Sequence, residues 1–76
     1  SAREFMVAPS DLRWLEHRLS NANRQLQEAR ASSVELRRML KPDHPVLLAN
    51  ELRLAQAKLR WAEAIEALCD FSVDED

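Results

Sequence analysis

The chain has 76 residues with one cysteine and no glycine, and its 11 basic and 13 acidic side chains give a net charge of −2. A chain of this length forms at most one small domain, which needs a disulfide, a metal or a partner to stabilise it. Cys69 has no second cysteine to pair with, and His17, His44 and Cys69 are not spaced as metal ligands on one helix face. We therefore expect no metal and no cofactor, and a stabilising protein partner or a homodimer.

The composition predicts an all-α fold. Leu, Ala, Arg, Glu and Gln, which are strong helix formers, dominate the sequence. The absence of glycine excludes the Asn-Gly and Asp-Gly turns of tight β-hairpins, and it also excludes a Gly-rich phosphate loop. Basic and acidic residues are interleaved, which gives no electrostatic footprint for nucleic acid.

Three features of the chain bear on its location. No apolar run approaches the roughly 20 residues that span a bilayer, and the N-terminus lacks the apolar core of a signal peptide. A lone cysteine suits a reducing compartment, so we expect an intracellular, cytoplasmic protein without a membrane partner. We interpret "SAREF" at residues 1–5 as a cloning remnant before Met6, within a disordered segment at residues 1–9.

The first helix is predicted over about residues 10–40. Pro42 ends it, because the residue before a proline is pushed out of the helical region. Apolar and small residues recur along this segment at alternating spacings of three and four, which is typical of a coiled-coil seam. These positions are Leu12, Leu15, Leu19, Ala22, Leu26, Ala29, Ser33, Leu36 and Leu40.

The second helix is predicted over about residues 45–70, after a turn at residues 41–44. Asp43 or His44 is the expected N-cap, and Pro45 is tolerated in the first turn. The two helices are similar in length, so we expect an antiparallel hairpin over residues 10–71. Residues 72–76, "SVDED", read as an acidic tail.

The second helix carries two apolar stripes, although a single neighbouring helix covers only one. We assign one stripe to the hairpin seam: Leu48, Leu52, Ala55, Leu59 and Ala62, facing Leu12, Leu15, Leu19, Leu26 and Leu36 of the first helix. We assign the other stripe to partner binding, because exposed tryptophan is enriched at binding hot spots. Its residues are Leu47, Leu54, Trp61, Ile65 and Leu68.

The acidic side chains of the second helix do not predict catalysis. Glu63, Glu66 and Asp70 lie within one segment, but a catalytic pair of carboxylates needs a cleft and two distinct environments, which a two-helix rod does not offer. Cys69 has no nearby base to activate it as a nucleophile. We therefore expect a protein that is not an enzyme.

Two segments resemble parts of tetratricopeptide repeats of the kinesin-light-chain type. "LKPDHPVLLANEL" at residues 40–52 is similar to the inter-repeat joint "LGPDHPxVAxxLxxL", and "WAEAIEAL" at residues 61–68 is similar to the second-helix pattern "YxEAIEAY". The resemblance implies a fragment of an α-solenoid scaffold that binds peptides or proteins. The glycine that usually precedes the second pattern is missing here.

The expected function is that of an interaction module. A helical hairpin would dimerise or dock on a partner helix through the stripe with Trp61, completing a three- or four-helix bundle. Two alternatives stay open beside it. One is a small chaperone or regulator that shields a partner subunit, since size and layout are similar to the hairpin chaperones of bacterial type III secretion. The other is the tetratricopeptide-type scaffold fragment.

Overall fold

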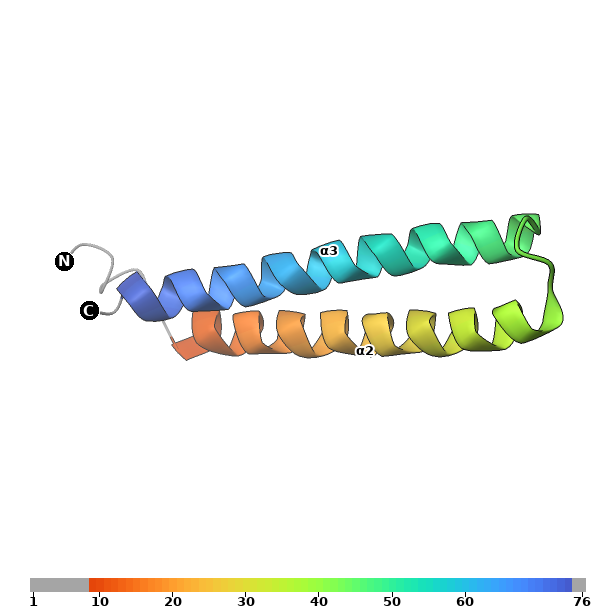
Figure 1. The fold of residues 1–76 in the computed structure, drawn as a ribbon. Helices are drawn as coiled ribbons and strands as arrows, with labels where there is room; N and C mark the ends of the chain where they lie inside the picture. Colours follow the sequence, from red (N-terminus) through yellow and green to blue (C-terminus); the bar gives the residue numbers. More distant parts are fainter. Residues whose placement is uncertain (1–8, 75–76) are drawn as a thin grey trace.

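The protein is an antiparallel hairpin of two long helices, as Figure 1 shows. This computed structural model describes residues 9–74, which form α2 (Pro9–Met39), a short connection and α3 (Pro45–Asp74). The molecule is a rod with extents of 56 × 15 × 15 Å. The predicted all-α hairpin is thus confirmed. Neither α2 nor α3 combines the length and the apolar character needed to cross a membrane.

The helix boundaries differ from the predicted ones mainly at the ends of the hairpin. Pro9 belongs to α2, where proline at a first helical position loses no hydrogen bond, and it was expected in the disordered segment. α3 continues to Asp74, so residues 72–74 of the predicted acidic tail are helical. No proline or glycine follows Pro45 to interrupt the helix, and Phe71 near its end is half-buried. The predicted cloning remnant lies outside the described residues.

The connection between the helices is a hydrogen-bonded turn over residues 41–44. The His44 amide donates to the Lys41 carbonyl at 3.0 Å, with Pro42 at the second position that β-turns favour for proline. The His44 carbonyl then accepts the first α3 bond from Leu48 at 3.0 Å, and its Nδ1 accepts from the Val46 amide at 3.1 Å. His44 is therefore the N-cap of α3, one of the two predicted candidates.

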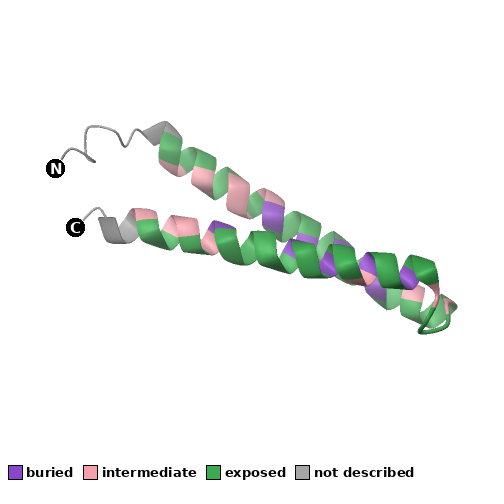
Figure 2. Cartoon of the chain, turned by 90° about the horizontal axis from the view of Figure 1, so that it is seen from above, coloured by how far each residue is buried: buried purple, intermediate pink, exposed green. Residues whose placement is uncertain are grey.

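Small side chains allow the two helices to approach closely. The buried residues of α2 are Ala22, Leu26, Ala29 and Ser33, and those of α3 are Leu47, Asn50, Leu54, Ala57 and Ala64 (Figure 2). Ala29 and Ala64 are both 0% exposed, and Leu26 packs with Leu54 in the central cluster. We call these two sets the hairpin interface. Its alternation of large and small residues is how two helix surfaces interlock at short range.

Candidate docking surface

A stripe of apolar side chains on α3 is left uncovered by α2. Leu48, Leu52 and Leu59 are 54%, 62% and 60% exposed. Ala55, between Leu52 and Leu59, and Ala62, which follows Leu59, are exposed too. We call these five residues the outer stripe. At about 3.6 residues per turn they lie on nearly the opposite side of α3 from the hairpin interface. Single exposed leucines are ordinary, whereas an aligned set marks an interaction surface.

The two stripes of α3 are therefore exchanged relative to the prediction. Leu48, Leu52 and Leu59 were assigned to the hairpin seam and are exposed. Leu47 and Leu54 were assigned to partner binding and are 5% and 9% exposed between the helices. The cause is the close approach of the helices at Ala22, Ala29 and Ser33. The stripe that faces α2 is the one with Asn50, Ala57 and Ala64 between its large residues, and it interlocks with the small residues of α2.

The other predicted residues lie along the hairpin interface or at its edge. Leu26 is buried, in agreement with the predicted seam, and the rest of the predicted α2 set is half-buried at the same spacing: Leu12, Leu15, Leu19 and Leu36. Ile65 and Leu68 of α3 are half-buried. Trp61 is 37% exposed, so part of its ring stays accessible. Trp61 and Ile65 line a shallow depression together with Leu19, Glu16, Ser20 and Asn23 of α2.

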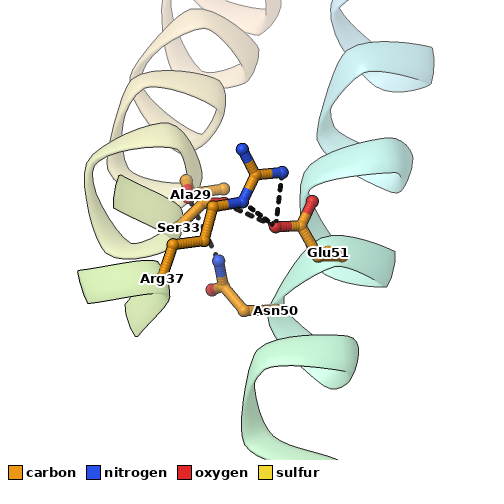
Figure 3. A network of polar contacts seen from close by, with 5 residues as sticks. All are labelled: Ala29, Ser33, Arg37, Asn50 and Glu51. Carbon is orange, nitrogen blue, oxygen red and sulfur yellow. Dashed lines mark hydrogen bonds and ion pairs between the residues drawn. The ribbon is translucent and has the colours of Figure 1, made fainter. Parts of the chain in front are cut away.

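A polar network fixes the register of the helices near the turn, as Figure 3 shows. Glu51 Oε1 accepts hydrogen bonds from Ser33 Oγ at 2.7 Å and from Arg37 Nε at 3.0 Å, and Arg37 also forms an ion pair with it at 2.9 Å. Asn50 Nδ2 donates to the Ala29 carbonyl at 3.2 Å. Among the described residues no buried side-chain nitrogen or oxygen lacks a partner. The network therefore favours one register of the two helices, and it does so without leaving a buried polar side chain unpaired.

The same contacts shift the ionisation of Glu51. The hydrogen bond from Ser33 is the main cause that lowers the pKa of Glu51 below the ordinary glutamate value of 4.5, and the Arg37 and Lys58 charges act in the same direction. Partial burial opposes the shift but does not outweigh it. These contacts favour the carboxylate form of Glu51, which lies at the edge between the hairpin interface and the outer stripe.

The surface of α2 that faces away from α3 has no matching stripe. The large exposed apolar residues of α2 are Trp14, Val34 and Met39, which do not form a continuous stripe, because charged or amide side chains separate them. Trp14 lines a depression beside Arg60 and Glu63 of α3, so it does not belong to the far surface of α2. Trp14 lies under the guanidinium of Arg18, 5.8 Å from the ring centroid, a cation–π contact. The hairpin is thus asymmetric: α2 is apolar on one side, whereas α3 is apolar on two.

The described residues contain no group of three or more His, Cys, Asp or Glu side chains arranged to hold a metal ion. Glu63 is exposed and is paired with Arg18 at 3.9 Å across the helices. Glu66, Cys69 and Asp70 are exposed on α3. Leu47, Leu40 and Pro42 line a second open depression beside the turn, with Arg37 and Glu51. The outer stripe is the most extended uncovered apolar feature among these sites.

Sequence reasoning missed four residues that determine which side of α3 meets α2: Asn50, Glu51, Ala57 and Ala64. The signal for them was present in pairs of residues and not in either helix alone. A serine and an arginine four residues apart on one helix match an adjacent amide and carboxylate on the other. Small residues spaced seven apart on α3 match those on α2.

The comparisons with known proteins give this chain no relative: no protein-family model, no curated protein and no solved structure matches it.

Proposed function

We propose that this chain is a non-enzymatic protein–protein interaction module that docks on a partner helix through the outer stripe of α3. The observation that supports the proposal most directly is the exposure of Leu48, Leu52 and Leu59 in one line, on a helix whose other side is already covered. An apolar side chain contributes about 1.5–3 kcal/mol when it passes from full exposure to full burial, before the cost of association is subtracted.

The limited hairpin interface also supports a docking role. Alanine occupies several of its buried positions, and no large side chain of the described residues is fully buried. Small interfaces of this kind contribute little hydrophobic free energy, and a second apolar surface that binds only in the folded hairpin would stabilise the fold through mass action. The predicted stripe with Trp61 is replaced in this proposal, because Leu47 and Leu54 are not accessible in the folded hairpin.

The proposal is tested by a photo-crosslinking amino acid such as benzoylphenylalanine, placed in the chain in the cells that produce it. At position 52, in the outer stripe, we expect a covalent product with one discrete protein chain. At position 24, an exposed residue on α2, we expect none. Adding Leu59→Glu to the position 52 variant should remove the product, because a carboxylate would have to be buried in the contact.

Mass spectrometry of the product identifies the partner. A product containing this chain indicates self-association, and a product containing a different chain indicates a heteromeric complex of the kind expected for a chaperone or scaffold. Equal cross-linking at positions 52 and 24, or no product at position 52 in a folded variant, would contradict docking through the outer stripe.

A further inference from the structure

We propose that the occupant of the outer stripe is a second copy of this chain, docked antiparallel so that α3 packs against α3 about a two-fold axis level with Arg53 and Leu54. This inference rests on the docking function proposed above and names its partner. It is argued from the order of large, small and charged residues along the outer stripe and its two edges.

The outer stripe has the spacing of a coiled-coil core. Its residues follow one another at intervals of four, three, four and three, from Leu48 to Ala62. When two such helices run antiparallel about the proposed axis, Leu48 lies level with the partner's Leu59, and Leu52 lies level with the partner's Ala55. Two leucines therefore meet in each outer layer of the contact, and a leucine meets an alanine in each inner layer. All four of these residues are covered in both copies.

Charges along one edge of the stripe select this register. Glu51 and Lys58 occupy the edge positions that flank a coiled-coil core, seven residues apart on α3. About the proposed axis, Lys58 comes within two residues of the level of the partner's Glu51, and the symmetry repeats the pair. A shift of one heptad would instead place Lys58 beside the partner's Lys58 in one direction, and Glu51 beside the partner's Glu51 in the other. Opposite charges at such edges set orientation and register, and like charges oppose them.

Glu66 argues against the other arrangements. It continues the spacing of the outer stripe one step beyond Ala62 and is exposed. A parallel pair in register would bring Glu66 against the partner's Glu66 within the contact, and the antiparallel register shifted by one heptad would place it against the partner's Leu48. In the proposed register Glu66 lies beyond the start of the partner's α3 and remains solvated, so no carboxylate is buried.

The native cysteine provides a direct test. Cys69 is exposed, and no second cysteine competes for a spin label. In the proposed dimer the two labels lie roughly 15 residues beyond the axis in opposite directions, which corresponds to about 46 Å at 1.5 Å per residue. A shift of one heptad gives about 36 Å or about 57 Å, depending on its direction, and a parallel pair brings the labels to about 10 Å. Double electron–electron resonance separates these distances, with light scattering to measure the mass.

A distance near 46 Å in a species of twice the chain mass is the expected result. A distance near 36 Å or 57 Å, strong short-range coupling from a parallel pair, or a monomeric mass at every concentration would overturn the proposal. Lys58→Glu should weaken the dimer roughly tenfold, because each favourable pair becomes repulsive. Arg24→Glu, the same charge change on the far side of α2, should leave the dimer unchanged.

The two proposals fail differently. If the chain stays monomeric while the probe at position 52 cross-links to a different protein, the second copy is wrong and the docking surface stands. If the chain stays monomeric and position 52 gives no product, both proposals are wrong. Circular dichroism of each variant shows whether the hairpin is folded, so that loss of association is not confused with loss of structure.

Discussion

Glu51 connects the hairpin interface to the outer stripe through a single carboxylate. Its Oε1 accepts from Ser33 and Arg37 on α2, while Lys58 on its own helix also lowers its pKa. These donors come from positions that an antiparallel hairpin brings together and that a shifted register would separate. A side chain at the edge of the interface therefore contributes to the choice of register, whereas the leucines contribute mainly through the area that they bury.

The ionisation of Glu51 makes the stability of the hairpin depend on pH. Because the folded-state pKa is lowered below 4.5, the contribution of Glu51 is fully present above about pH 4.5 and is lost as the pH falls through the lower, folded-state value. We expect chemical denaturation followed by circular dichroism to show a decline in stability below about pH 4.5, and Glu51→Gln to reduce that decline.

An NMR titration of the Glu51 side-chain carbon tests the cause. The pKa should lie below 4.5 in the native chain and move toward 4.5 in Ser33→Ala, since the Ser33 hydrogen bond is the largest contribution. Arg37→Leu should move it in the same direction. A native value at or above 4.5, or one that Ser33→Ala leaves unchanged, would contradict the role assigned to this hydrogen bond.

At the scale of the helices, the structure predicts opposite effects for leucines two positions apart. Leu54 is 9% exposed in the hairpin interface, and Leu52 is 62% exposed in the outer stripe. Leu54→Glu buries a charge without a partner and removes core packing, so we expect a loss of about 3 kcal/mol or more, enough to unfold a small hairpin. Leu52→Glu should cost at most about 0.5 kcal/mol in the monomer.

Urea denaturation at a concentration where the chain is monomeric measures both changes. Ala31→Glu on the exposed side of α2 is a matched control that introduces the same side chain away from both apolar surfaces. If Leu52→Glu unfolded the hairpin and Leu54→Glu did not, the two stripes would be arranged as the sequence alone predicted, and the docking surface would have to be reassigned.

The contrast between the two helices explains how far the sequence could predict this structure. α2 has one apolar stripe, so its spacing alone predicts which side faces α3, and buried Leu26 lies where that spacing places it. α3 has two stripes with the same spacing, and periodicity cannot choose between them. The choice depends on interlocking with Ala29 and on the partners of Ser33, which are properties of a pair of helices. The tetratricopeptide resemblance stays a prediction.

The start of α3 was easier to predict from the sequence than its end. The sequence before Pro45 limits the cap of α3 to Asp43 or His44, and His44 makes the bonds that a cap requires. The C-terminal end has no such signal, and α3 continues past half-buried Phe71 to Asp74. Local chemistry therefore limited the first boundary to two candidate residues, whereas no proline or glycine in the sequence marks the second.

For the whole molecule, the position of the outer stripe predicts an open assembly. The stripe lies on nearly the opposite side of α3 from α2, so two copies joined through it place the helices in the order α2, α3, α3, α2 across a layer. A closed four-helix bundle, one of the two forms expected from the sequence beside a three-helix bundle, requires each helix to touch two neighbours at roughly right angles in cross-section. The two arrangements differ in shape although they contain the same helices.

Small-angle X-ray scattering of the dimer distinguishes the layer from the bundle. With neighbouring axes about 9 Å apart, the outer helices of a layer are about 27 Å apart, whereas no two axes of a closed bundle are separated by more than about 13 Å. We therefore expect a flattened cross-section with a large cross-sectional radius of gyration, and a return to the single-hairpin value in Leu59→Glu. A compact cross-section in the native dimer would mean that a face including Trp61 and Ile65 forms the contact, in place of the outer stripe.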